Sequence, residues 1–510
     1  MRVLFQIRDN STSIPGGDLV VASSLMRELA ACGVDVEMRT DHDSDVRGYD
    51  VVHIFNYDVP FALNAARCGV PYVVTPMFED FGRYFERSQR AICAFARHLS
   101  GDMPPDVLNA ELRGISGRSS AELSYADIAF MAEGAQATFA SGESEGRRIK
   151  EAFPKAGPVW PVHLGFARPT SVKGDAVELC AERFGVRDFV LCVGRLESRK
   201  NQLMLLHALR DDDIPLVFVN SSAFDDEYGR LCRAYPRRGR TIFTGRVDAE
   251  TLCALYAAAR VHALPSWYEL PGLVSLEAAW AGCEVVAPDW GTLPSYLGDL
   301  VHYCDPSDPD SIRRAVLAAL GSSKASGARD ALAQCTWESA AQRVLGVYED
   351  VAAACATEVG AERLRGIRRV ASMEEGLRAR RRRAMDMAFT APGDSLRLAT
   401  GLLRQRPGNP SLLYCCGVAH TVAGQFIEAE RCLKAALKLQ PFLCVEAYLY
   451  LALGMSRQGR PGEVLRVVDN VARLFPFVQP EHFSLLEQYR KQAVCVMERD
   501  DGLGVLEFPA

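Results

Sequence analysis

The sequence has few of the features that mark exported, membrane-spanning or metal-binding proteins. It contains 16 cysteines but no Cys-x-x-Cys pair, and its nine histidines are not clustered. This pattern favours reduced thiols over a disulfide framework or a zinc site. Met1 leads directly into an apolar segment, residues 3–7, and no uninterrupted apolar run has the length of a membrane span. We therefore expect a cytoplasmic protein without a signal peptide, a transmembrane helix, a cofactor or a bound metal ion.

A strong excess of one charge is also absent. The formal net charge of the 510 residues is -6, which gives no reason to expect a nucleic-acid partner. With 48% hydrophobic and 24% charged residues, the composition is that of a soluble globular protein. A chain of this length holds about three domains of ordinary size, each able to bury its own core.

The first predicted domain covers residues 1–172, where short apolar runs alternate with helical patterns. This alternation predicts a doubly wound parallel sheet. The expected strands are residues 3–7, 34–38, 51–55 and 70–75. Gly16 and Gly17 follow the first strand, where paired glycines either form a simple turn or let a ligand approach a helix start closely. Residues 84–123 are poorly patterned, and we predict no structure for them.

The second predicted domain covers residues 173–335 and brings two cations to the end of a strand. Residues 189–193 form an apolar strand that leads into Gly194, Arg195 and, five residues further on, Lys200. Across a turn these two cations can converge on a diphosphate, with arginine making a forked contact and lysine a point charge. The alternative is an ordinary charged surface turn.

Residues 260–298 read as a strand, a polar loop, a helix and a further strand. The loop carries Glu269, Pro271 suits the first helical position, and the helix from Gly272 presents free N–H groups and a positive dipole end. Glu277 lies two turns along this helix, so two carboxylates flank an anion site. Such carboxylates suit a ligand that carries hydroxyls beside phosphates, as nucleotide sugars do. The alternative is a solvated loop residue and a surface helix residue.

These residues carry a family resemblance. Pro265-Ser266-x-x-Glu269, followed by Glu277-Ala278-x-x-Ala281-Gly282, resembles the motif of two glutamates with seven residues between them in retaining glycosyltransferases of family 4. The resemblance implies the GT-B fold, in which two Rossmann-like domains face each other across a cleft: an N-terminal acceptor domain and a C-terminal nucleotide-sugar domain. It also implies that Glu269 positions the donor sugar and that Glu277 binds the ribose.

The same resemblance assigns further residues. Arg195 and Lys200 would bind the donor diphosphate, and residues 49–56 resemble a family strand that places His53 and Asn56 on the acceptor side, although His53 is equally well explained as a packed structural histidine. The remaining donor-side positions are Gly16, Gly17, Gly194, Val247, Gly272 and Leu273. The chain departs from the family twice: residues 75–80 lack the histidine that many relatives carry near the reacting sugar, and Ser295 stands where a glutamate is common.

The last third of the sequence is helical in pattern. Residues 336–356 resemble the helix that crosses back to the first domain. Residues 357–383 form an Arg-rich linker helix, which either contacts anionic lipid or is simply solvated. In residues 384–510, Pro407, Pro441 and Pro476 lie 34 and 35 residues apart, which predicts tetratricopeptide repeats and a capping helix. Such repeats bind a protein partner, or else they pack on the transferase domains.

The predicted function is a retaining, metal-independent glycosyltransferase that moves a hexose from a nucleoside diphosphate sugar to a hydroxyl acceptor. The acceptor would be a glycan, a lipid-linked glycan or a protein, in bacterial surface polysaccharide or glycoconjugate synthesis. If the Arg-rich segment binds lipid, the protein would act at the inner face of the membrane. Two alternatives stay open: an inactive repeat-bearing scaffold, and a sugar-nucleotide-dependent synthase or phosphorylase on the same fold.

Overall fold

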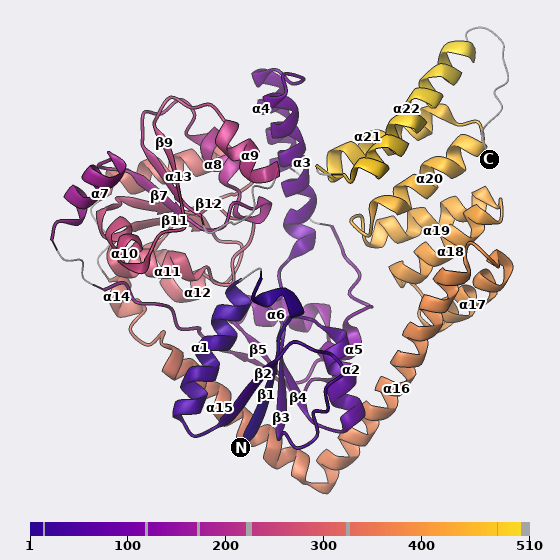
Figure 1. Cartoon of the computed structure of the whole chain (residues 1–510), viewed down its shortest axis with the longest axis horizontal. Coiled ribbons are helices and arrows are strands. Elements are labelled where there is room, and N and C mark those ends of the chain that lie inside the picture. The colour runs from indigo at the N-terminus through magenta and orange to yellow at the C-terminus, as the bar shows by residue number, and fades with distance from the viewer. Residues whose placement is uncertain are drawn as a thin grey trace. The chain divides into compact units, whose positions relative to one another are not determined.

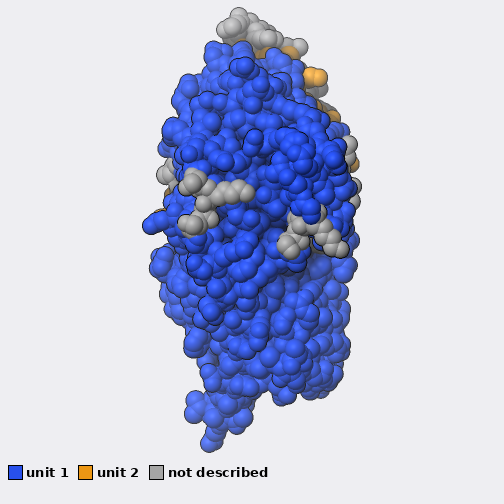
Figure 2. Space-filling view, turned by 90° about the vertical axis from the view of Figure 1, so that its left-hand side faces the viewer, with its two compact units in different colours: residues 1–119, 128–371 blue, residues 120–127, 372–510 orange. Residues whose placement is uncertain are grey.

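A computed structural model describes residues 1–13, 16–117, 121–170, 174–220, 227–322, 327–476 and 478–500. The chain forms two compact units (Figure 1). Unit 1 comprises Met1–Ser119 and Ile128–Ala371, and unit 2 comprises Ser120–Asp127 and Ser372–Ala510; Figure 2 shows unit 1 in blue and unit 2 in orange. Unit 1 holds two six-stranded parallel sheets, and the part of unit 2 that is described contains helices. The predicted fold class, two Rossmann-like domains followed by an all-α region, is confirmed.

Lobe 1 of unit 1 is built around the sheet β2-β1-β3-β4-β5-β6. All its neighbouring strands are parallel, and β3, β4 and β5 are buried along their whole length, as expected for a sheet covered on both faces. Its strands are β1 (Arg2–Gln6), β2 (Asp35–Arg39), β3 (Val51–Phe55), β4 (Tyr72–Thr75), β5 (Ala137–Ala140) and β6 (Val159–Pro161). The covering segments are η1 (Asp9–Ser11), α1 (Gly17–Ala31), α2 (Val59–Cys68), α5 (Ala129–Gly134) and α6 (Glu143–Ala152).

Lobe 2 repeats this plan with the sheet β12-β11-β10-β7-β8-β9. Because β7 and β10 are direct neighbours, the loops at their carboxyl ends meet. The strands are β7 (Val190–Val193), β8 (Leu216–Val219), β9 (Thr241–Gly245), β10 (Val261–Ala263), β11 (Glu284–Pro288) and β12 (His302–Cys304). The helical segments are α7 (Ala176–Phe184), η2 (Ser198–Lys200), α8 (Gln202–Ala208), α9 (Glu227–Ala234), α10 (Ala249–Ala258), α11 (Leu273–Ala281), α12 (Pro294–Leu297), η3 (Gly298–Leu300), α13 (Pro309–Gly321) and α14 (Ala328–Ala331).

The segment without a clear pattern forms a helical hairpin that leaves lobe 1 and packs on lobe 2. It consists of α3 (Phe81–Leu99) and α4 (Pro105–Ser116), which lie beside α8 and α9 (Figure 1). Phe95, Leu108 and Leu112 are fully buried in the same core cluster as Leu205 of α8. The apolar faces of both helices therefore belong to the core of lobe 2, although α3 directly follows the lobe-1 strand β4 in the chain.

Two long helices follow lobe 2. Helix α15 (Trp337–Ala356) returns to lobe 1, where Val344 and Tyr348 join the core around Phe5. Helix α16 (Glu358–Met387) begins after one intervening residue, and Ile367 and Ala371 pack in the lobe-1 cluster around Tyr72. The first half of the predicted linker helix is therefore packed against lobe 1.

Unit 2 is a series of helix pairs. Helices α20 (Val445–Arg457) and α21 (Pro461–Leu474) begin 35 residues after α18 (Pro410–Val422) and α19 (Phe426–Leu439). Gly417 lies where α18 meets α19, and a Cβ there would come within 2.5 Å of Leu433. The remaining helices are α17 (Pro392–Gln405) and α22 (Pro480–Asp500). The period agrees with the predicted repeats, while their assignment to the tetratricopeptide class stays a prediction.

Unit 2 also holds a short segment from the first half of the chain. The carboxylate of Asp127 accepts hydrogen bonds from Arg381 Nη1 (2.8 Å), Asn409 Nδ2 (2.8 Å) and Ser411 Oγ (2.9 Å). The backbone N–H of Ser124 donates to the carbonyl of Leu439 (3.2 Å). This segment was predicted as part of the first domain, and the structure groups it with the helix pairs instead.

The packing of the hairpin yields a stability prediction. Truncating Phe95 to alanine removes a buried ring that contacts Tyr235 edge-on at a centroid distance of 5.7 Å. We expect Phe95→Ala to lower the free energy of unfolding by about 3–5 kcal/mol. Val107 on α4 is 45% exposed, so Val107→Ala is the matched control and should change stability by no more than about 0.5 kcal/mol. Urea denaturation of the two variants measures both values, and equal midpoints would contradict the packing described.

Candidate functional site

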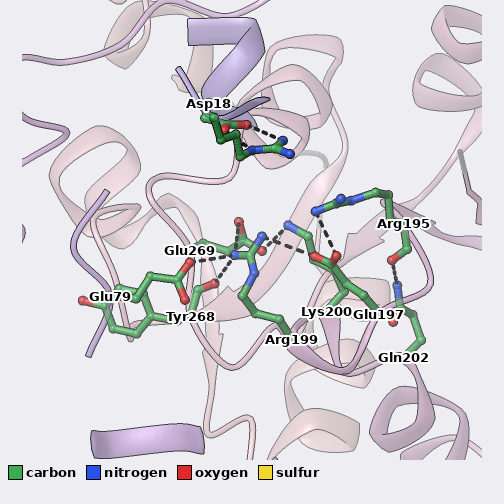
Figure 3. Close-up of polar contacts among 10 residues, drawn as sticks. Asp18, Glu79, Arg195, Glu197, Arg199, Lys200, Gln202, Tyr268 and Glu269 are labelled. Carbon is green, nitrogen blue, oxygen red and sulfur yellow. Dashed lines mark hydrogen bonds and ion pairs between the residues drawn. The ribbon is translucent and has the colours of Figure 1, made fainter. Parts of the chain in front are cut away.

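An ion pair joins the loops that follow β7 and β10. Lys200 Nζ lies 2.6 Å from Glu269 Oε1, and the two side chains are only 12% and 8% exposed (Figure 3). Burial alone would raise the pKa of Glu269, but Lys200 and Arg199 lower it below its ordinary value. Glu269 is therefore held as a carboxylate. The structure thus brings together two residues that the sequence placed at the ends of different strands.

Arg199 connects this pair to lobe 1, and the sequence did not single it out. Its Nη1 donates to the Tyr268 carbonyl (3.0 Å) and lies 3.5 Å from Glu79 Oε1 and 3.9 Å from Glu269 Oε2. Although burial disfavours its charge, the surrounding carboxylates, Glu269 first, raise the pKa of Arg199 above its ordinary value. One guanidinium therefore joins carboxylates from both lobes.

Glu79 is the lobe-1 member of this network. It lies in the loop after β4, where the sequence lacks the histidine found in many relatives, and it accepts a hydrogen bond from Tyr84 Oη. Burial raises the pKa of Glu79, and the neighbouring Glu269 adds to the rise, while Arg199 opposes it. Its place at the carboxyl end of a parallel strand is the sequence signal that could have identified Glu79 as a site residue.

Arg195 occupies the other end of the network in Figure 3. Its Nη2 lies 2.9 Å from Glu197 Oε2, and its backbone carbonyl accepts a hydrogen bond from Gln202 Nε2 (2.7 Å). Gly194, just before it, has φ +153°, and a Cβ there would lie 3.8 Å from the Lys200 side chain. Arg195 and Lys200 thus both follow the carboxyl end of β7, and Glu197, which lies between them in the sequence, pairs with Arg195.

The start of α11 differs from the prediction. Pro271 does not occupy the first helical position: the Leu270-Pro271 bond is cis, and Gly272 is the N-cap with φ +86°. The helix therefore starts at Leu273, later than the start at Pro271 or Gly272 that the sequence indicated. Gly272 is required because a left-handed backbone at this point strains any residue with a Cβ, and a Cβ would also lie 3.3 Å from Glu269. Leu273 packs between the core clusters of both lobes.

Glu277 is separate from the Lys200 cluster. On α11 it is half-buried, and its Oε2 accepts a hydrogen bond from Tyr256 Oη of α10 (2.9 Å). Burial raises the pKa of Glu277 to about 7, against the smaller lowering effect of Tyr256. The pKa values of the two predicted glutamates are therefore shifted in opposite directions, because among the described residues cations pair with Glu269 and none pairs with Glu277.

The glycine pair lies at the start of α1. Gly16 is the N-cap, and a Cβ there would come within 2.6 Å of Asp18 Oδ1 and 3.0 Å of Arg8 Nη2. Asp18 is buried and accepts from Arg8 at 2.6 and 3.1 Å and from Asn56 Nδ2 at 3.2 Å. Asn56, predicted on the acceptor side, thus lies beside the glycine loop, and Arg8 and Asp18 are site neighbours that the sequence did not reveal.

Three further predicted positions have simple roles in the fold. His53 is fully buried; its ring nitrogens lie 2.5 Å from Tyr348 Oη and 2.7 Å from Thr75 Oγ1, and burial lowers its pKa to about 3. The acceptor-side assignment of His53 is therefore replaced by its packing role. Val247 follows β9 and packs against the lobe-2 core, and the hydroxyl of Ser295 donates to the Thr292 carbonyl at 2.7 Å.

The described residues include neither a metal-binding cluster nor a membrane-spanning helix. No group of three or more His, Cys, Asp or Glu side chains there could hold a metal ion. Within the same residues, no helix has both the length and the apolar character needed to cross a membrane.

Comparison with known proteins matches this region to one family. Residues 182–333 match the model of glycosyl transferases group 1, so lobe 2 carries a domain of this kind. The chain is similar to the O-antigen chain mannosyltransferase B of Escherichia coli, with 32% identity over 32% of this chain and 45% of that protein. It is also similar to a GDP-mannose-dependent alpha-(1-6)-phosphatidylinositol monomannoside mannosyltransferase of Mycolicibacterium smegmatis, with 33% identity over 28% and 41% of the two chains.

Among solved structures, a sucrose-phosphate synthase from Thermosynechococcus elongatus aligns with a TM-score of 0.48 and 18% identity, covering 69% of this chain and 100% of that one. The chain spans less than half the length of the two curated relatives named above.

The environment of Glu277 predicts a pH effect on stability. Its pKa in the folded state, about 7, lies above the ordinary glutamate value of 4.5, so the folded state binds this proton more tightly than the unfolded state does. The resulting stabilisation is complete below 4.5 and is lost as the pH rises through about 7. We expect the wild-type protein to lose stability relative to Glu277→Gln across this interval. Urea unfolding at a series of pH values measures the difference, and parallel curves for the two proteins would refute it.

Proposed function

We propose that the protein is a glycosyltransferase that moves a hexose from a nucleoside diphosphate sugar to a hydroxyl acceptor. The observation that carries this proposal is the Lys200–Glu269 ion pair at the adjoining ends of β7 and β10. It lies inside the region that matches glycosyl transferases group 1. The activity of the whole chain is inferred from this part of it.

The site geometry suits a ligand with both phosphates and hydroxyls. Arg195 and Lys200 provide a fork and a point charge for a diphosphate, and the N-terminus of α11 adds free N–H groups. Glu269 is an anionic acceptor for sugar hydroxyls, and Glu277 lies further along α11 where a ribose could be bound. A donor that presents phosphate to Lys200 and a hydroxyl to Glu269 would keep both buried groups partnered.

The chemistry follows from the same charges. Cleavage of the sugar–phosphate bond leaves negative charge on the diphosphate, which Arg195 and Lys200 would stabilise at fixed positions. We propose that transfer proceeds with retention and without a metal ion, and that Glu269 positions the sugar. The Arg199 bridge would hold Glu79 at the acceptor side of the same centre.

The relatives suggest which donor to test first. One of them is described as GDP-mannose-dependent, and another as an O-antigen chain mannosyltransferase. We therefore propose GDP-mannose as the first donor and a bacterial surface glycan or glycolipid as the class of acceptor. If GDP-mannose and other nucleotide sugars all fail to bind, the inactive scaffold becomes the better explanation. A product made with a small sugar phosphate as acceptor would favour the synthase alternative.

The donor site can be tested with one substitution and a matched control. Lys200→Ala removes a charge-assisted contact worth about 1.5–3 kcal/mol, so donor affinity should fall roughly ten-fold or more. Lys155→Ala removes an exposed lysine outside the site and should leave the affinity unchanged. Titration calorimetry with GDP-mannose and GDP measures both. Unchanged donor affinity in both Lys200→Ala and Glu277→Ala would show that the donor does not bind at the proposed site.

Metal independence has a separate test. Because Arg195 and Lys200 supply the positive charge that a cation would otherwise provide, transfer should continue in excess chelator. Product formation followed by mass spectrometry, with and without chelator, measures this. Activity that disappears with chelator and returns only with magnesium or manganese would contradict the proposal.

A further inference from the structure

An apolar groove lies on unit 1 away from the candidate site, where α15 meets α16. It has a volume of about 430 Å³, within the range of roughly 300–1,000 Å³ seen for sites of small organic ligands. Val347 and Val351 of α15 form one wall, and Trp160 of the edge strand β6 and Val359 of α16 form the other sides. Gly360 is required at this corner, because a Cβ there would lie 2.1 Å from the Ala354 carbonyl.

The amide and hydroxyl side chains in the lining, Gln136 and Thr357, are already hydrogen-bonded within the protein. Gln136 accepts a hydrogen bond from the Tyr72 backbone N–H and donates to the Gly134 carbonyl. Thr357 donates to the Ala354 carbonyl and accepts from the Gly360 N–H. Since these groups bond within the protein, the groove offers little to a polar ligand and favours an apolar one.

The groove carries charges of both signs, with Glu358 and Glu362 also exposed on α16 next to Val359 and Arg363. Arg363 lines it, and its Nη2 lies 3.6 Å from where a Cβ of Gly157 would be, so the guanidinium reaches from α16 to the loop before β6. Among the described residues, no carboxylate forms an ion pair with Arg363. Arg369 follows on the exposed side of α16, and Lys155 is exposed two residues before Gly157. Asp350 is the acidic member of the lining.

Two large apolar side chains at this groove are exposed to solvent. Trp160 is 44% exposed and Val359 is 81% exposed. Exposed apolar surface next to Arg363, which has no ion-pair partner among the described residues, suits the boundary of an anionic bilayer, where tryptophan sits at headgroup level and arginine meets phosphate. A phosphate can accept two hydrogen bonds from such a guanidinium, which favours a phospholipid over an apolar protein partner.

Addition of a peptide strand to β6 is disfavoured by the edge itself. The strand has only three residues, Val159–Pro161, and its last residue has no N–H to donate. A peptide would find a short and incomplete ladder here.

We propose that this groove binds an anionic phospholipid of a bilayer surface. An acyl chain would lie against Val347, Val351 and Trp160, and the headgroup phosphate would pair with Arg363. The site involves no residue of the proposed donor site, so it can hold or fail independently of the catalytic proposal. It also gives the Arg-rich segment a specific point of contact with lipid, through its first two turns.

Vesicle binding by the full-length protein tests this assignment. We expect cosedimentation with vesicles of equal parts phosphatidylcholine and phosphatidylglycerol, little binding to phosphatidylcholine alone, and a decrease with added salt. Arg363→Glu changes the local charge by two units and should weaken binding roughly ten-fold or more. Arg230→Glu reverses an exposed arginine on α9 as the matched control and should bind like wild type. Bromine-labelled lipid should quench tryptophan fluorescence in the wild type, and Trp160→Phe should abolish the quenching.

Several results would overturn the proposal. Equal binding to both kinds of vesicle, or wild-type binding by both Arg363→Glu and Val359→Ser, would place any lipid contact elsewhere. No binding to either vesicle would exclude the site. A dimer in sedimentation equilibrium that dissociates in Val359→Ser would show that a second copy covers the groove. Donor binding by each variant reports folding, because Arg363 and Val359 are exposed side chains remote from the candidate site.

Discussion

Burial of the α3–α4 hairpin in the core of lobe 2 is the constraint on which the rest of unit 1 depends. The loop of Glu79 leads directly into α3, so the docking of this helix carries a lobe-1 carboxylate to Arg199 in lobe 2. Tyr84 of the same helix stacks on Tyr268 at a centroid distance of 6.1 Å. Separating the lobes would expose these apolar faces and leave buried charges without partners. A hydrophobic contact outside the site therefore assembles it.

The site holds equal numbers of cationic and carboxylate side chains, but the pKa values of its carboxyl groups are shifted in different directions. Three cations, Arg195, Arg199 and Lys200, face the three carboxylates Glu79, Glu197 and Glu269. Burial acts on both Glu79 and Glu269, yet the pKa is raised at Glu79 and lowered at Glu269, because Lys200 pairs only with the latter. The two carboxyl groups therefore have pKa values shifted in opposite directions within one network, and Glu269 is the one held as an anion.

The parts that were predictable from the sequence depend on local patterns. Lys200 and Glu269 each follow a buried apolar run, and the strand-loop-helix order placed both residues at the carboxyl ends of parallel strands. The hairpin could not be predicted in the same way, because the apolar residues around Phe95 and Leu112 find their partners about a hundred residues later in lobe 2. His53 was ambiguous because its partner Tyr348 is 295 residues away. Glu79 was overlooked because a carboxylate alone, without its arginine, has no spacing that identifies it.

The segment that ends at Asp127 gives the chain an unusual order of completion during synthesis. Its partners Asn409 and Ser411 lie 282 and 284 residues further on. A ribosome that adds about 5–20 residues per second reaches them roughly 15–60 s after Asp127. During that time the sheets of unit 1 can form while Asp127 is still without these two partners. The segment that ends at Asp127 therefore lacks part of its contacts until α18 has been synthesised. If synthesis stops before α18, the released chain leaves Asp127 without Asn409 and Ser411.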